Sequence, residues 1–312
     1  MSPGERSAVT KVDAALRGVD ALLPFLFEHA PVRGALVRLE DTRRKVLACH
    51  DYPAPLARAL SELLAASALL ASTLKLDGSL VVQLAGDGPV RLLVVDCTGG
   101  LDVRATAQWD QAAVAALGET ASLSALAGGA SRGRLALTLD QRGTGTLYQG
   151  IVSLDATSIA ASIEHYLATS EQLQSRLWLV PDEGGVTGLL LQRLPDAGDA
   201  DVPAWPRAVE DAGRGVGRVG DAASFAAMLG ELFPRDDIRM FDARPVRFRC
   251  RCSAGRVANA LRIAGRDEVE AALAERGVVE VTCEFCNRHY TFGPAEARAL
   301  FAPPPHDGAP AR

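Results

Sequence analysis

The chain has 312 residues, of which 48% are hydrophobic and 23% are charged, and its formal net charge is −5. Such a composition is typical of a globular protein with a real core, and the length suggests two domains or one large domain with an appendage. The acidic balance argues against a general binder of nucleic acid or of anionic membranes. Since no apolar run approaches the roughly 18–20 residues that span a bilayer and the N-terminus lacks a signal-peptide core, we expect a cytoplasmic protein.

Residues 1–15 are expected to form a flexible lead-in, and residues 16–195 an α+β core domain built on a mixed or antiparallel sheet. Helices are predicted at residues 56–75 and 159–170, and the first is apolar nearly all round, which indicates burial on several sides. Apolar segments at residues 20–27 and 43–49 flank the first predicted strand, residues 35–39. Further strands are predicted at residues 80–84, 90–96, 101–107, 134–140, 146–152, 175–180 and 188–193.

Residues 196–240 differ in composition from the core and are predicted to be a metastable helical linker. The run from Gly213 to Gly220 holds four glycines and few apolar residues. Glycine weakens helices, so few buried contacts are expected here. Residues 222–233 recover a helical spacing of apolar side chains, which predicts a short helix that melts easily.

Residues 241–301 form a small C-terminal module that contains four of the six cysteines. We predict a hairpin leading into Cys250, helices at residues 253–263 and 267–275, a strand ending at Cys283 and a strand at residues 289–292. Residues 302–312, which are rich in proline, are predicted to be a disordered tail. The cysteines form two tight pairs, Cys250-Arg-Cys252 and Cys283-Glu-Phe-Cys286.

Two close cysteine pairs separated by about thirty residues are typical of a tetrahedral zinc site. In a reducing compartment paired cysteines indicate metal binding or redox sensing rather than structural disulfides. We therefore predict one Zn²⁺ per chain, held by Cys250, Cys252, Cys283 and Cys286. A module of about sixty residues has a marginal core, so metal removal should unfold it.

The simpler interpretation of this site is a static zinc clip, but two features favour a switch. Within each pair the sulfurs are close enough to form a local disulfide once the metal leaves. Arg247, Arg249 and Arg251 place positive charge around the first pair, which stabilises thiolates and keeps them oxidisable.

The remaining candidate residues are interpreted as structural. Cys49 and Cys97 lie in apolar, strand-like stretches and are expected to be inert core thiols. His289 could ligate a metal, but four thiolates are already present and a surface position is the better interpretation. The Gly143-Thr-Gly145 run lacks the residues of a phosphate loop and is expected to be a hairpin turn. The histidines support no catalytic triad, so we expect no catalytic residues.

Several motifs together resemble the 33 kDa chaperonin family, a redox-regulated heat-shock chaperone of bacteria. The resemblance covers residues 16 to 301 and is carried by Leu69–Leu80, Gly86–Val90, Tyr148–Val152, Ser170–Gln172, Phe248–Ser253 and Cys283–Cys286.

The resemblance implies a holdase, an ATP-independent chaperone that binds unfolding proteins under oxidative or heat stress. In the reduced, inactive state the four matching cysteines would bind zinc. Oxidation would form the disulfides Cys250–Cys252 and Cys283–Cys286, release the metal and unfold the C-terminal region. The active form would be a homodimer, with residues 16–195 as the dimerisation domain, and would bind neither nucleic acid nor membranes.

Two other classes of protein remain open at this point. One is a nucleic-acid binder with a C-terminal zinc ribbon, although residues 241–312 hold eleven Arg against nine Asp and Glu (11 − 9, a net of +2), which is too little for a basic footprint. The other is a thiol-disulfide oxidoreductase that uses Cys283 and Cys286, although the strand–helix–strand context of thioredoxin-like proteins is missing.

Overall fold

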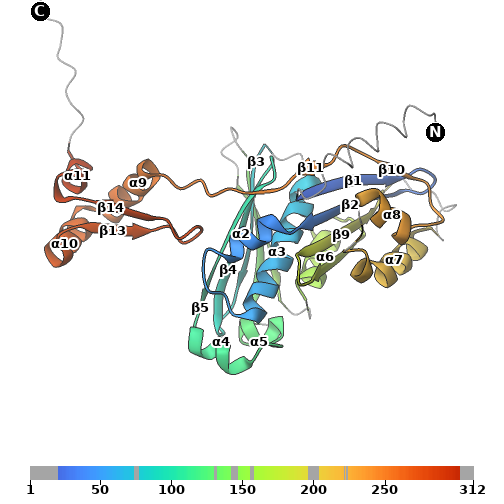
Figure 1. The fold of residues 1–312 in the computed structure, drawn as a ribbon, viewed down its shortest axis with the longest axis horizontal. Coiled ribbons are helices and arrows are strands. Elements are labelled where there is room, and N and C mark those ends of the chain that lie inside the picture. Colours follow the sequence, from blue (N-terminus) through green and yellow to red (C-terminus); the bar gives the residue numbers. More distant parts are fainter. Residues whose placement is uncertain are drawn as a thin grey trace, which may run out of the picture. The chain divides into compact units, whose positions relative to one another are not determined.

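The structure is a computed structural model that describes residues 20–73, 77–129, 132–141, 147–154, 158–195, 204–220, 222 and 224–302 (Figure 1). The chain divides into two compact units, and the division falls between Arg249 and Cys250. The first unit contains two six-stranded sheets, which we call sheet A and sheet B, and the second contains a two-stranded sheet with three helices.

Sheet A is antiparallel throughout and has the order β10-β1-β2-β9-β8, with β11 paired to β1 beside β10. Its strands are β1 (Ala21–Phe27), β2 (Val32–Leu39), β8 (Ser175–Pro181), β9 (Val186–Arg193), β10 (Ile238–Met240) and β11 (Arg244–Pro245). Both faces of this sheet are buried. Leu22 and Val37 point toward one apolar cluster and Leu23 toward another, which explains why the strands are nearly continuous apolar runs.

Sheet B has the order β12-β5-β4-β3-β6-β7. Its strands are β3 (Gly78–Ala85), β4 (Val90–Thr98), β5 (Asp102–Trp109), β6 (Arg134–Gln141), β7 (Leu147–Ser153) and β12 (Arg247–Phe248). Only the β12–β5 pair is parallel; the other neighbours are antiparallel. The turn expected at residues 143–145 lies outside the described residues, between β6 and β7, which pair as the predicted hairpin.

Helix α3 (Ala54–Thr73) packs against both sheets, and its buried side chains belong to one large apolar cluster with the inner faces of A and B. Among the described residues it alone is long and apolar enough to cross a membrane, with a mean hydropathy of 1.3, but 78% of that stretch is buried inside the protein. The sequence expectation that no apolar run approaches this length is therefore wrong, and burial between two sheets is the physical reason for the composition. The other helices of the first unit that precede the linker are α2 (Asp41–Leu47), α4 (Gln111–Leu117), α5 (Leu123–Ala127) and α6 (Ile159–Thr169).

The second face of sheet A is covered by helices of the predicted linker, as Figure 1 shows for α7 and α8. These are α7 (Ala204–Gly215), a 3-10 turn (Val216–Arg218) and α8 (Phe225–Leu232). Trp205, Phe225 and Leu232 are buried, and Phe233 contacts the ring of Phe27 edge-on at 5.0 Å. The prediction of few buried contacts is therefore wrong, because the sparse apolar side chains between the glycines all gather on one face.

Two glycines of this region are used for close packing rather than flexibility. A Cβ on Gly215 would lie 2.7 Å from a methyl carbon of Leu232, so the absence of a side chain lets α7 approach α8. Gly220 lies against the side chains of Arg38 and Asp182, with a virtual Cβ 3.0–3.2 Å from their polar atoms. The metastability of this linker stays a prediction, as do the domain boundaries drawn from sequence.

The second unit has the two helices and two strands in the predicted order, followed by a third helix, α11, that was not predicted. It contains α9 (Ala254–Ala264), α10 (Arg266–Arg276), β13 (Val279–Thr282), β14 (His289–Phe292) and α11 (Pro294–Ala299). Its buried apolar cluster has only four members, Val269, Leu273, Val279 and Ala297. The unit is thus poor in buried apolar side chains, in keeping with a module that needs additional stabilisation.

The hairpin predicted to lead into Cys250 is wrong. Strands β10 and β11 pair with β1, and β12 pairs in parallel with β5, so residues 238–249 extend the edges of two different sheets. We refer to β10, β11 and β12 as the three short strands. The strand-like stretch expected around Cys49 is also wrong, because residues 41–47 form α2 and Cys49 follows in a turn.

Candidate metal centre

The four paired cysteines meet in the second unit. Cys250 and Cys252 precede α9, while Cys283 and Cys286 lie in the turn between β13 and β14. The four sulfurs all lie within 4.8 Å of one another, close enough to hold a metal ion. The sulfurs of Cys252 and Cys286 lie 3.4 Å apart, and those of Cys250 and Cys283 lie 3.7 Å apart.

These separations fit tetrahedral zinc. With Zn–S bonds of about 2.3 Å, neighbouring sulfurs of a tetrahedron lie about 3.8 Å apart. The separations of 3.4 and 3.7 Å between sulfurs of different pairs approach that value. A set of four thiols also matches the soft ligands that zinc prefers in closed structural sites.

Local backbone structure positions each pair. After the second pair, Asn287 has φ of 55°, a left-handed conformation that asparagine tolerates. This turn is closed by a 2.8 Å hydrogen bond from the Asn287 N–H to the Cys283 carbonyl and a 2.9 Å bond from the Cys283 N–H to the Arg288 carbonyl. Next to the first pair, the Ser253 hydroxyl accepts from the Arg256 N–H and so fixes the start of α9.

The environment distinguishes the four sulfurs. Burial alone would raise the pKa of the Cys252 thiol, but hydrogen bonds from Tyr290 and the other cysteines outweigh it and lower that pKa to about 7. The Tyr290 hydroxyl donates to the Cys252 sulfur at 3.0 Å. Burial raises the pKa of the Cys283 and Cys286 thiols. The site therefore contains one sulfur whose thiolate is favoured even without an ion.

The Arg249 guanidinium contacts Asp102 at 3.3 Å. The predicted role of Arg247, Arg249 and Arg251 in stabilising thiolates of the first pair stays a prediction. Arg288 and Tyr290 were missed, although both follow closely after Cys286. The hydrogen bond to Tyr290 and, to a smaller extent, the charges of Cys252 and Cys286 raise the pKa of Arg288. His289 is exposed and hydrogen-bonds Thr282 at 2.9 Å, outside the four-sulfur group, as predicted.

The two remaining cysteines differ from each other. Cys97 is fully buried in the main apolar cluster, as expected of a core thiol. Cys49 is only half-buried, and its thiol donates to the Lys45 carbonyl at 3.3 Å, so its assignment to the core is wrong. The physical reason is its position just after α2, where the chain turns at the surface.

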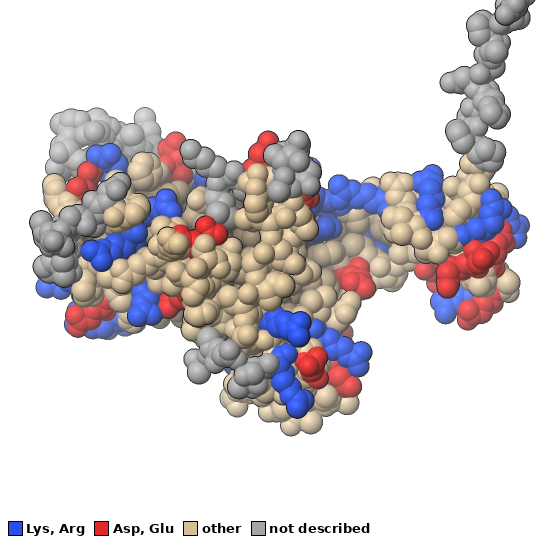
Figure 2. Space-filling view, turned by 180° about the vertical axis from the view of Figure 1, so that it is seen from behind, with Lys and Arg blue, Asp and Glu red and all other residues tan. Residues whose placement is uncertain are grey.

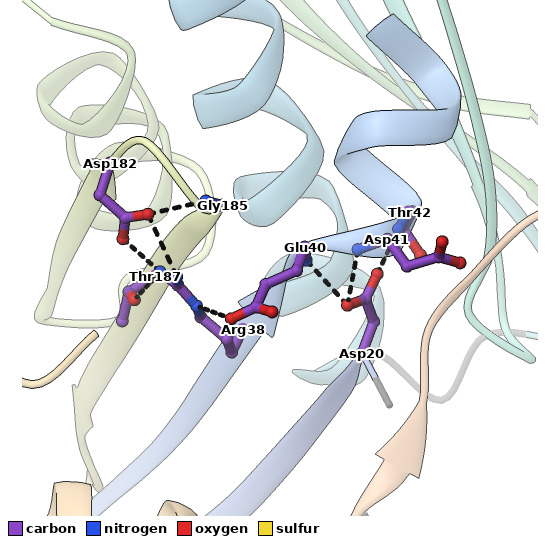
Figure 3. Close-up of polar contacts among 8 residues, drawn as sticks. All are labelled: Asp20, Arg38, Glu40, Asp41, Thr42, Asp182, Gly185 and Thr187. Carbon is purple, nitrogen blue, oxygen red and sulfur yellow. Dashed lines mark hydrogen bonds and ion pairs between the residues drawn. The ribbon is translucent and has the colours of Figure 1, made fainter. Parts of the chain in front are cut away.

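The segment that precedes the cysteines, residues 244–249, is hydrogen-bonded to several other parts of the first unit. Figure 3 shows the Asp20 carboxylate accepting from the backbone N–H groups of Glu40 (2.7 Å), Asp41 (3.2 Å) and Thr42. The Asp20 carbonyl accepts from the Val246 N–H at 2.9 Å, and the Thr42 hydroxyl donates to the Val246 carbonyl at 3.3 Å. Val246 is thus hydrogen-bonded through its N–H to Asp20 and through its carbonyl to Thr42, and these two residues are also bonded to each other.

The contacts continue on both sides of Val246. The N–H groups of Arg247 and Arg249 donate to carbonyls of the β5 region at 3.1 and 2.9 Å. On the other side of the network, Figure 3 shows Arg38 bonded to Asp182, Glu40 and Thr187, while Asp182 also accepts from the Gly185 N–H at 2.7 Å. This cluster holds the β8–β9 turn next to Gly220 of the linker.

Comparison with known proteins identifies the family. Residues 20–293 match the family described as Hsp33 protein. The chain belongs to the Hsp33 family. It is 42% identical over 284 residues to the 33 kDa chaperonin of Methylobacillus flagellatus, covering 90% of this chain and 94% of that protein, and equally similar to the one from Nitrosococcus oceani. Its fold resembles the crystal structure of the 33 kDa chaperonin from Thermotoga maritima, with a TM-score of 0.68 at 21% identity over 90% of this chain and 97% of that one.

Membership of the Hsp33 family supports a redox-regulated chaperone and agrees with the mixed α+β fold and its four-cysteine cluster. Two observations on the described residues bear on the rival classes. On the face shown in Figure 2, acidic and basic side chains are interspersed rather than gathered into one basic stripe. Cys283 and Cys286 lie between two antiparallel strands, not at the start of a helix as in thioredoxin-like sites.

Proposed function

We propose that this Hsp33 protein is an ATP-independent holdase of the bacterial cytoplasm, inactive when reduced and zinc-bound and active as a homodimer after oxidation. The observation that carries the proposal is a four-sulfur cluster in a unit whose buried apolar cluster, among the described residues, has only four members. Such a unit depends on its metal for folding. The unit would therefore unfold when its four thiolates are oxidised and no longer bind the metal.

In the reduced state Cys250, Cys252, Cys283 and Cys286 would hold one Zn²⁺ per chain. Bound zinc would supply the free energy that keeps the second unit folded and would hold all four sulfurs as thiolates. Tyr290 would keep its hydrogen bond to Cys252, and Asn287 would hold the turn that places the second pair. No residue of the chain is assigned a catalytic role.

On oxidation each pair of thiolates would give two electrons to one molecule of hydrogen peroxide, which would take up two protons from the solvent and leave as two waters, and one S–S bond would form in each pair. The pairs proposed are Cys250–Cys252 and Cys283–Cys286. The four sulfurs are spread over distances of up to 4.8 Å, as a tetrahedral metal site requires. A disulfide needs its two sulfurs about 2.05 Å apart, so the local disulfides would require that arrangement to break, and oxidation would be coupled to loss of the metal.

Unfolding of the second unit would then remove the anchor at the end of the three short strands. Once β10, β11 and β12 separate from β1 and β5, the linker helices would be tied to sheet A by side-chain packing alone. Their departure would uncover an apolar sheet face that is now buried, a surface suited to unfolding clients of many shapes. Its members include Ala21, Leu23, Phe25, Phe27, Leu189 and Leu191.

The proposal is tested by counting zinc and free thiols before and after peroxide at raised temperature, with suppression of thermal aggregation measured on the same samples. We expect close to one zinc per reduced chain, loss of that zinc together with four thiols, and suppression that rises in step. Equal suppression by the reduced, zinc-loaded protein would refute the switch. Zinc loss without any gain of suppression would refute the link between the cluster and client binding.

A further inference from the structure

Tyr290 links the two cysteine pairs of the candidate metal centre. It lies in β14, opposite Val281 of β13, and its hydroxyl donates to the Cys252 sulfur at 3.0 Å. Cys252 comes 38 residues earlier in the chain. The hydrogen bond thus joins the strand that follows the second pair to a sulfur of the first pair.

The pleat of β14 determines where the Tyr290 side chain lies. On one face of the hairpin, the exposed His289 is hydrogen-bonded to Thr282 of the neighbouring strand at 2.9 Å. Successive side chains of a strand point to opposite faces. Tyr290 therefore shares the other face with Phe292, which packs against the apolar cluster of the second unit. The half-buried Tyr290 ring is held on this packed face, and its one polar atom contacts Cys252.

Arg288 adds a charged group to this contact. Its guanidinium hydrogen-bonds the Tyr290 hydroxyl, which in turn donates to the Cys252 sulfur. Hydrogen bonds in a chain polarise one another, and a charged donor strengthens the effect. Arg288 therefore makes the Tyr290 hydroxyl a better donor to the sulfur.

The sulfurs of the second pair are hydrogen-bonded in a different way. Cys283 accepts from two backbone N–H groups of its own turn, and Cys286 accepts from the backbone N–H of Arg288. Cys252 instead lies in a segment without helix or strand and accepts from a side chain of another segment. A single substitution can therefore remove the donor to Cys252 and leave the backbone bonds of the second pair in place.

We propose that Tyr290 is a positioning residue whose hydroxyl slows both the loss of the metal and the oxidation of Cys252. It would thereby set how readily the cluster responds to an oxidant. The inference rests on the proposed function, in which the four thiolates bind zinc and react with peroxide. Partners that hydrogen-bond a metal ligand fix its orientation, and their loss typically lowers metal affinity by about 10- to 100-fold.

The same hydrogen bond acts on the reaction with the oxidant. When the Cys252 thiolate attacks hydrogen peroxide, an S–O bond forms, the O–O bond breaks, and hydroxide leaves and takes a proton from the solvent. The Cys250 thiolate then attacks the Cys252 sulfur, which forms the S–S bond and releases a second hydroxide, also protonated by the solvent. Because the Tyr290 hydroxyl draws charge from the attacking sulfur, its hydrogen bond slows the first step.

The test compares reduced, zinc-loaded full-length variants by transfer of zinc to a chromogenic chelator, with and without hydrogen peroxide. Tyr290→Phe keeps the ring and removes only the hydroxyl, so β13 and β14 should keep their protection from hydrogen exchange. We expect zinc to bind at least about ten-fold more weakly and to be released faster by peroxide. Tyr148→Phe is the matched control, because Tyr148 is 57% exposed on β7 of the first unit.

Two further measurements separate positioning of one sulfur from general loosening of the unit. Alkylation mapped by mass spectrometry should increase at Cys252 relative to Cys283, whose hydrogen bonds come from its own turn. Arg288→Gln should change zinc affinity less than Tyr290→Phe does. Combining the two substitutions should add little to the effect of Tyr290→Phe, because Arg288 acts on the sulfur mainly through the hydroxyl.

The outcomes distinguish this inference from the proposed function. If Tyr290→Phe binds and releases zinc as the natural chain does, or if alkylation increases equally at both cysteines, the positioning role is overturned and the proposed function stands. A natural chain that binds no zinc when reduced would overturn both. Faster zinc loss from Tyr290→Phe without earlier suppression of thermal aggregation would support the role of Tyr290 and refute the proposed function.

Discussion

Truncation of Phe233 should release the linker without any oxidation. Its ring is buried on the second face of sheet A, 5.0 Å from the ring of Phe27 and 6.1 Å from that of Phe25. Replacement of a buried Phe by Ala costs about 3–5 kcal/mol. If this loss acts on local opening of the linker, the open population rises by about two to four orders of magnitude.

The expected result is that Phe233→Ala suppresses thermal aggregation while reduced and fully loaded with zinc. Hydrogen exchange should locate the change, with faster exchange in α8 and unchanged exchange in α3. Phe241→Ala is the matched control, because Phe241 is 48% exposed and its truncation creates no buried cavity. Rapid exchange in α8 of a Phe233→Ala protein that remains inactive would refute the idea that the covered face of sheet A binds clients.

Three further outcomes are expected. Chelation of the reduced protein should melt α9, α10 and α11 while sheets A and B keep their thermal transition; a second unit that stays folded, by hydrogen exchange, would contradict its dependence on metal. Burial, partly offset by Arg58, raises the pKa of Glu62 from 4.5 to about 7, so ionisation destabilises the fold as pH rises from about 4.5 to 7. Glu62→Gln should thus raise the free energy of unfolding by at most about 3 kcal/mol above pH 7 and leave it unchanged below pH 4.5. Chemical denaturation measures both values, and an equal gain in stability at the two pH values would contradict this origin. Asp20→Ala removes the acceptor for three backbone N–H groups at α2. We expect the free energy of unfolding to fall by about 1–2 kcal/mol and amide hydrogen exchange at Val246 to become faster. Asp51→Ala, at an exposed position, is the control and should change neither.

Much of the first unit is predictable from local patterns. Alternating apolar residues indicate the strands of sheet B, and the all-round apolar surface of α3 indicates burial on several sides. The four-cysteine cluster follows from spacing alone, because short pairs need only one long-range contact to meet. These features depend on residues that are close in sequence.

The features that were missed depend on partners far away in the chain. The three short strands have only two or three residues each, too few for a period, and their partners in β1 and β5 lie more than one hundred residues earlier. The burial of α7 and α8 was missed for a related reason: glycine content indicates weak intrinsic helix, but not which surface lies opposite. Tyr290 was overlooked because a tyrosine in a strand is normally read as packing, and only its 3.0 Å contact with Cys252 reveals another role.

The three short strands have one more consequence, because they lie between the linker and the cysteines in sequence. Between the cysteines and α8, the N–H groups of Arg249, Arg247 and Val246 donate to the carbonyls of Val103, Leu101 and Asp20. If the second unit unfolds as the proposed function requires, these three bonds would have to open before separation along the chain reaches α8. Loss of one of them leaves the other two in place, so release of the linker would require all three to open.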